Sequence, residues 1–213
     1  MKTEELVAAL AAGAGPADAR GPVRRFAVAL VLGSLLAALA MAVLLGVRPT
    51  LGRDSGLAMF WVKLAFVGAL AIAGLIAALR LSRPGASLGW PPYAAAVPTV
   101  GIWLVALIEL ARAEPAARLA LVLGQTAAVC PFRIAGLALP VFVAALWAMK
   151  GLAPTRLRLA GAAAGLLAGG TGAFVYAFHC PELEAAFLGV WYVIGMLIPV
   201  ALGALVGPRV LRW

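Results

Sequence analysis

Two cysteines, one histidine and a nearby glutamate are the residues of this chain whose types and spacing could do chemistry. Cys130 and Cys180 are the only cysteines, His179 is the only histidine, and a proline follows each cysteine. Proline restricts the residue before it to extended backbone, so each thiol is expected at a helix end or in a loop. Two thiols can form a disulfide. With His179 and Glu182 they would also offer a soft or borderline metal ion two thiolates, an imidazole and a carboxylate.

Three interpretations of the cysteine pair compete. A structural disulfide is the simplest, because cysteines in oxidising compartments usually pair. Closing a loop of about fifty residues would stabilise the fold by about 4 kcal/mol, an upper limit for a chain already confined by a membrane. A reversible redox or metal-responsive pair is the second interpretation. Catalytic thiol exchange is the third, and the chain lacks the Cys-x-x-Cys spacing that tunes such enzymes. One histidine and two cysteines are too few for a four-ligand structural zinc site built from cysteine and histidine alone.

The composition excludes a water-soluble fold. Of 213 residues, 65% are hydrophobic and only 12% are charged, and the mean hydropathy is +1.07. A net charge of +9 would indicate nucleic-acid binding in a soluble protein. Here the lysines and arginines lie in short segments between apolar runs, where they act as topology signals. We therefore expect membrane lipid as the surroundings and no direct nucleic-acid binding.

Six apolar runs have about the length that a helix needs to cross a bilayer. They predict an all-α, polytopic bundle of six transmembrane helices, with spans at about residues 26–46, 60–79, 93–111, 132–149, 157–178 and 186–206. Residues 1–25 form a separate N-terminal helix and linker, and residues 26–213 form the transmembrane domain. The sixth span is expected to stop before Pro208, because proline removes a helical hydrogen bond. Residues 119–129 are too short to span, and predict either an interfacial helix or a bent extension of the fourth span.

The charges predict the orientation. Eleven of the 17 lysines and arginines fall on the side of the N-terminus and six on the other, so the positive-inside rule places both termini in the cytoplasm. In a bacterium the chain would then be a multi-pass protein of the inner membrane. Both cysteines would lie on the periplasmic side, facing an oxidising compartment.

Inside the spans, small residues dominate and ionisable residues are scarce. Gly161, Gly165 and Gly169 recur every four residues, which predicts a face for close helix packing within the bundle. Lys63 and Glu109 lie within about a turn of span ends, so we expect both to reach the membrane interface. A transporter would need ionisable groups near the midplane. Their absence from the sequence argues against transport.

The N-terminal tail predicts a short helix. Thr3 is a suitable N-cap, and Glu4 and Glu5 favour the positive end of the helix dipole. Leu6, Val7 and Leu10 gather on one face. A helix this short is marginal in water, so it would order against a partner groove or the membrane surface. A frayed tail without a partner is the alternative.

Taken together, these elements resemble a known family, the NrsF-type bacterial anti-sigma factors. The resemblance covers nearly the whole chain, and its motifs keep their order relative to the six spans. They are Met1-Lys2-Thr3-Glu4-Glu5-Leu6, Phe60-Trp61-Val62-Lys63, His179-Cys180-Pro181-Glu182, Trp191-Tyr192 and Gly207-Pro208-Arg209-Val210-Leu211-Arg212-Trp213. Cys130 lies in a less recognisable context.

The resemblance implies a regulator and not an enzyme. Such a protein would hold an extracytoplasmic-function (ECF) sigma factor through its N-terminal segment, here Thr3, Glu5, Leu6, Val7 and Leu10. It would release the sigma factor under metal or oxidative stress sensed by the cysteine pair. The resemblance favours the responsive pair over the structural disulfide. It implies no obligatory cofactor, only a transient metal ion at the cysteines. A quinone-linked thiol oxidoreductase and a small-molecule or metal transporter remain the rivals.

Overall fold

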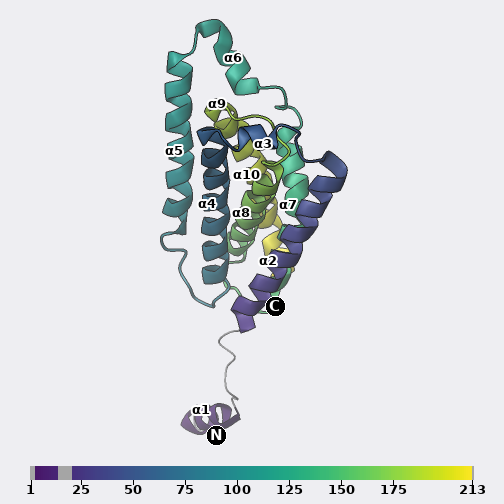
Figure 1. Ribbon diagram of the computed structural model, residues 1–213. Helices are drawn as coiled ribbons and strands as arrows, with labels where there is room; N and C mark the ends of the chain where they lie inside the picture. Colours follow the sequence, from purple (N-terminus) through teal and green to yellow (C-terminus); the bar gives the residue numbers. More distant parts are fainter. Residues whose placement is uncertain (1–2, 14–20, 213) are drawn as a thin grey trace.

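The computed structural model describes residues 3–13 and 21–212, and every regular element within them is helical (Figure 1). Six helices are long and apolar enough to cross a membrane. The predicted class, an all-α bundle with six such helices, is confirmed. Met1, Lys2, Arg20 and Trp213, which entered the charge count or the motifs, lie outside the described residues.

Within residues 21–212 the helices follow one another directly or through short loops. Their bounds are α1 Thr3–Gly13, α2 Gly21–Ala40, η1 Met41–Leu45, α3 Leu51–Asp54, α4 Ala58–Leu81, α5 Pro91–Arg112, α6 Pro115–Leu123, α7 Cys130–Lys150, α8 Leu157–Tyr176, α9 Ala185–Phe187, η2 Leu188–Tyr192 and α10 Val193–Val210. The segments η1 and η2 are π-helical. Gly46 ends η1 with φ +78°, a left-handed conformation that glycine adopts without a steric penalty.

The bundle has two ends with different contents (Figure 1). The thiol end is formed by residues 46–57, 113–129 and 177–184. The basic end is formed by residues 82–90 and 151–156 together with the adjoining helix ends, where α2 begins and α10 finishes. Its basic residues are Arg24, Arg25, Arg80, Arg83, Lys150, Arg156, Arg158, Arg209 and Arg212. Because the chain crosses the bundle six times, the start of α2 and the end of α10 lie at the same end.

Two predicted boundaries are resolved by the structure. Residues 115–123 form a separate helix, α6, and a turn through Gly124 divides it from α7, so the bent-extension alternative is wrong. The sixth span was expected to stop before Pro208, but α10 continues through Pro208 to Val210. A proline removes only one helical hydrogen bond, and helices of this kind tolerate that loss where neighbouring helices pack around them.

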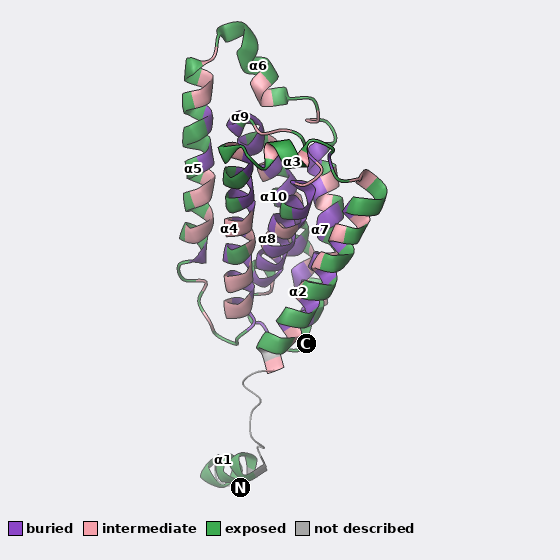
Figure 2. Ribbon diagram, in the orientation of Figure 1, coloured by how far each residue is buried: buried purple, intermediate pink, exposed green. Residues whose placement is uncertain are grey.

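Helix α8 lies at the centre of the bundle, between α4, α7 and α10 (Figures 1 and 2). Its glycines explain how closely it packs. A Cβ on Gly161 would overlap the backbone carbonyl of Gly203, and one on Gly165 would overlap the carbonyl of Pro199. One on Gly169 would lie 2.8 Å from the carbonyl of Met196. All three glycines therefore face α10 at backbone contact distance, as small-residue packing requires.

Replacing Gly165 with alanine is expected to destabilise the bundle by about 2 kcal/mol, because two backbones must separate to admit one methyl group. Gly136→Ala is the matched control, since a Cβ there has nothing within 4 Å. Thermal unfolding of the detergent-purified proteins measures the difference. Equal midpoints for the two variants would contradict the close α8–α10 contact.

Candidate functional site

Cys130 and Cys180 come together at the thiol end. Cys130 is the first residue of α7, and Cys180 lies in the loop between α8 and α9. Both are free thiols with 0% exposure, and both belong to one buried cluster with Tyr176, Phe187 and Tyr192. The structure thus pairs the cysteines without a disulfide between them. Both sulfurs lie in the interior of the thiol end, so neither thiol is exposed at the surface.

Lys63 lies under the same loop, and the expectation that it reaches the membrane interface is wrong. Its side chain has 0% exposure. Its Nζ donates to the backbone carbonyls of Cys180, at 3.0 Å, and Glu182, at 2.9 Å. The Tyr192 ring lies 5.0 Å from Nζ. Lys63 points inward because the backbone carbonyls of the irregular loop, which have no helical hydrogen bonds, supply the acceptors that the apolar surroundings lack.

Arg48, in the segment between η1 and α3, also contacts this loop. Its Nη1 donates to the Cys180 carbonyl at 2.9 Å and lies 3.3 Å from an Asp54 carboxylate oxygen. Its backbone N–H donates to the Phe178 carbonyl at 3.2 Å. The Cys180 carbonyl therefore accepts hydrogen bonds from two cationic side chains, Arg48 and Lys63. Two long-range contacts on one carbonyl fix the loop next to the thiols.

The electrostatic surroundings favour the thiolate of Cys180. Its pKa is lowered from 9.0 to about 5, first because the Cys130 thiol can donate a hydrogen bond to the thiolate. The positive charge of Lys63 lowers it further, while burial opposes the shift. A thiolate beside a protonated thiol is the arrangement that reacts with oxidants, since the thiolate is the nucleophile. The pair is thus suited to reversible oxidation.

His179 and Glu182, the other members of the proposed metal set, are held by hydrogen bonds. The Nδ1 of His179 donates to the Gly46 carbonyl at 2.8 Å, so its Nε2 accepts from Arg133 at 3.0 Å. Glu182 Oε1 accepts from the backbone N–H of Gln125 at 2.7 Å. Within residues 3–13 and 21–212, no three histidine, cysteine, aspartate or glutamate side chains are arranged to hold a metal ion. The four-ligand set remains a prediction that would require these bonds to break.

Sequence reasoning missed the parts of the site that lie far from the cysteines in the chain. They are Arg48, Lys63, Tyr176 and Tyr192. The two tyrosine hydroxyls are buried, and the Tyr192 hydroxyl lies beside the Cys180 sulfur, whose thiolate it can stabilise by donating a hydrogen bond. One signal for Lys63 was present, because a lysine one turn into an apolar helix marks a functional site by default. Tyr192 belongs to the Trp191-Tyr192 motif of the resemblance, but nothing in the sequence singles out Tyr176.

A second carboxylate group lies at the edge of the thiol end. Glu109 Oε2 accepts from the backbone N–H of Ala186 at 2.8 Å, so Glu109 also turns inward rather than to the interface. Glu184 lies beside it, and its pKa is raised from 4.5 to about 7, first by a hydrogen bond with the Glu109 carboxyl and then by burial. Two carboxyl groups can share a hydrogen bond only while one keeps its proton.

This carboxyl pair predicts a pH dependence of stability. Between pH 4.5 and about 7 the folded chain holds a proton that the unfolded chain releases. Stability therefore falls as the pH rises through that interval. The thermal midpoint of the unmodified protein should drop more between about pH 5 and about pH 8 than that of Glu184→Gln, whose amide keeps a hydrogen bond without titrating. Parallel midpoints for the two proteins would contradict the shared proton.

The N-terminal helix α1 carries the predicted apolar stripe. Leu6, Val7 and Leu10 are exposed by 42%, 60% and 66%. Thr3 is the first helical residue, and Glu4 and Glu5 lie in the first turn. An exposed leucine and valine stripe on a short helix is the pattern of a helix that binds in a groove.

The fold and site define a class, namely polytopic helical membrane proteins with a buried thiol pair at one end of the bundle and an amphipathic helix before the first span. The family is narrower. The chain belongs to the NrsF family, described as negative regulator of sigma F, whose model matches residues 10–213. This description is that of a regulator.

Two relatives match over their full length. The chain is 53% identical over 213 residues to a probable anti-sigma-F factor NrsF of Azospira oryzae, covering 100% of both chains. It is 42% identical over 217 residues to the anti-sigma-F factor NrsF of Caulobacter vibrioides, again covering 100% of both. No solved structure matches this chain.

Proposed function

We propose that this chain is an inner-membrane anti-sigma factor that holds an ECF sigma factor through α1 and releases it when Cys130 and Cys180 are oxidised. Both termini lie in the cytoplasm in this proposal, and the thiol end lies in the periplasm. Membership of the family of negative regulators of sigma F supports the regulatory role. The basic residues at the basic end support the orientation.

One observation carries the coupling between the two sites: the cysteine loop is bonded to the outer end of α2, whose inner end leads toward α1. His179 donates to the carbonyl of Gly46, the residue that ends η1. Arg48, two residues later, donates to the carbonyls of Phe178 and Cys180. A change in the loop therefore acts on α2 directly. Single-turn π segments inside helices are frequent at functional sites, and η1 lies at this junction.

Along its length α2 packs on α7, the helix that begins with Cys130. A Cβ on Gly33 would lie 2.9 Å from the Val141 backbone. At the basic end, Arg25 donates to the Trp147 carbonyl at 2.7 Å, and its guanidinium lies 4.3 Å from the Trp147 ring centroid. Both thiols thus connect to α2, Cys180 through its loop and Cys130 through α7. In this proposal the protein has one state with reduced thiols and one with oxidised thiols, and the two states differ in the position of helix α2.

The sensing step is an oxidation by a hydroperoxide. The Cys180 thiolate attacks the terminal peroxide oxygen, forming an S–O bond as the O–O bond breaks, and the departing alkoxide takes a proton to leave as an alcohol. The Cys130 sulfur then attacks the Cys180 sulfur. The disulfide forms, and the hydroxyl leaves as water with the Cys130 proton. Two thiols are oxidised and one peroxide is reduced.

Metal capture is the second inducing route, and it requires more rearrangement. The two sulfurs suit a soft ion, but His179 and Glu182 would first have to give up their bonds to Gly46, Arg133 and Gln125. Oxidation needs only the two thiols. We therefore propose oxidation as the primary signal.

Leu10→Asp is expected to lower the amount of sigma factor that co-purifies with the full-length protein by about tenfold or more, because it places a charge in the apolar contact. Ala12→Asp, on the opposite face of α1, is the matched control and should retain the partner. Pull-down from unstressed cells followed by mass spectrometry identifies and quantifies the bound protein. If Leu10→Asp and Ala12→Asp retain equal amounts, α1 is not the binding segment. If no sigma factor co-purifies with the unmodified protein, the proposed function itself fails.

A further inference from the structure

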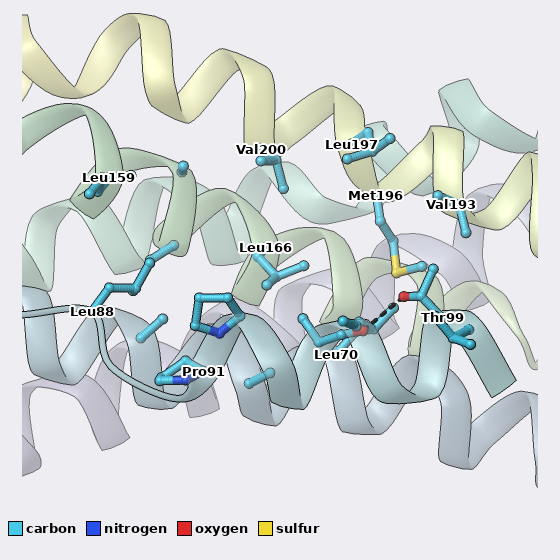
Figure 3. Close-up of a pocket in the computed structure, with 18 of the residues that line it drawn as sticks. Leu70, Leu88, Pro91, Thr99, Leu159, Leu166, Val193, Met196, Leu197 and Val200 are labelled. Atoms are coloured by element: carbon cyan, nitrogen blue, oxygen red, sulfur yellow. Dashed lines mark hydrogen bonds between the residues drawn. The ribbon is translucent and has the colours of Figure 1, made fainter.

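An apolar groove of about 600 Å³ lies between α5 and the central helices (Figure 3). Helix α5 contacts α4 along the bundle and α9 and η2 near the thiol end. It leaves a space beside α8 and α10. Small side chains keep this space open, among them Ala73 of α4, Ala96 of α5 and Ala162 of α8. Leu88 and Pro91 line one end, while Trp103 lines the other.

The polar groups of the lining already have partners within the protein. Thr99 Oγ1 donates to the Ala95 carbonyl at 2.8 Å, the bond drawn in Figure 3. Trp103 Nε1 donates to the Gly189 carbonyl at 2.9 Å. Water fills a cavity only where two or more polar partners hold it. A quinone ring likewise needs donors for its carbonyl oxygens. A flexible hydrocarbon chain needs no hydrogen-bond partner, so it is the occupant that this lining suits.

The end of the groove at Leu88 carries positive charge. Arg80 Nη1 donates to the Leu88 carbonyl at 3.2 Å, and its guanidinium lies 5.9 Å from the Trp90 ring centroid. Arg158 directly precedes Leu159, another lining residue. In residues 21–212 the one ion pair joins Arg48 and Asp54, at the opposite end of the bundle. Arg80, at the mouth of the groove, therefore has no carboxylate partner in this part of the chain.

We propose that the groove binds one anionic phospholipid, with an acyl chain between α5 and α8 and the phosphate at Arg80. Guanidinium groups recognise phosphate oxygens by paired hydrogen bonds, and an aromatic ring such as Trp90 settles at the headgroup level. The inference shares with the proposed function only the placement of the helices in a bilayer. Because Trp103 joins the groove to η2 next to the thiol cluster, the lipid would also support the packing of α5 on the sensor site.

Native mass spectrometry of the full-length protein tests this proposal without any sigma factor. The protein is released from nanodiscs of phosphatidylcholine containing a minor share of phosphatidylglycerol. We expect one retained adduct with the mass of phosphatidylglycerol. Arg80→Gln removes the charge, and Ala162→Phe fills the groove. Each variant should lower the fraction of protein that retains the adduct about fivefold or more. Arg24→Gln, on α2, and Ala201→Phe, an exposed position of α10, are the matched controls and should retain it.

Ala96→Phe, at an exposed position of the lining, is a second groove-filling variant in case Ala162→Phe does not fold. Several outcomes would overturn the proposal: no retained adduct, an adduct of quinone mass, a dimer that dissociates on filling the groove, or equal retention by the filled and control variants. None of them bears on whether α1 binds a sigma factor, so the two proposals fail separately.

Discussion

Replacing Lys63 with methionine will slow disulfide formation between Cys130 and Cys180 about tenfold near pH 6 and leave it nearly unchanged near pH 8. Methionine keeps the length of the side chain and removes the charge. With a pKa of about 5, Cys180 is almost fully a thiolate at pH 6. An opposite charge typically lowers a pKa by about 1–3 units. Without Lys63 the pKa of Cys180 rises, and a rise in the middle of that range leaves about a tenth of the thiolate at pH 6.

The measurement is the rate of thiol loss in excess hydrogen peroxide, followed by gel shift with a maleimide polymer after denaturation. In the unmodified protein the rate is flat above about pH 6, whereas in Lys63→Met it climbs with pH. Lys63→Arg should restore the flat profile. Lys150→Met, at the exposed end of α7, is the control. A uniform slowing at every pH would contradict the electrostatic role, because that result indicates altered access to the buried thiols.

The sequence predicted the elements better than their inward-facing contacts. Each span was recognisable as a run of about 20 apolar residues, the length that a helix needs to cross a bilayer. The Gly161, Gly165 and Gly169 spacing likewise pointed to a packed face, because side chains four apart share one side of a helix. These features depend on residues that are close together in the chain. They can therefore be predicted from short stretches of the sequence.

The site depends on contacts between distant segments. Lys63 and Cys180 are 117 residues apart, and Gly46 and His179 are 133 apart. A rule based on distance from a span end sends Lys63 to the interface. This rule fails because it does not take into account the buried backbone carbonyl groups of residues 177–184, which accept hydrogen bonds from Lys63. The groove beside α5 was also hidden, since the alanines that open it come from three helices.

Replacing His179 with phenylalanine will separate sensing from release. The variant loses the hydrogen bond to the Gly46 carbonyl and the bond with Arg133, yet it keeps an aromatic ring beside Tyr176, whose centroid lies 5.6 Å away. Neither lost bond involves a thiol. Cys130 and Cys180 should therefore form their disulfide at close to the normal rate. The loop can no longer act on η1 through Gly46, and release of the sigma factor from α1 should fall about tenfold, equivalent to about 1.4 kcal/mol of coupling.

The test compares bound sigma factor before and after peroxide treatment, with the thiol state measured in the same samples. His179→Asn is the informative partner variant, because its amide nitrogen can replace Nδ1 as a donor to Gly46. It should recover much of the release. Cys130→Ser should also fail to release the sigma factor, but in that variant no disulfide forms. If His179→Phe released the sigma factor as fully as the unmodified protein, the coupling would not pass through the His179–Gly46 bond, and the Arg48 bonds to the loop and the packing of α2 on α7 would be the remaining routes.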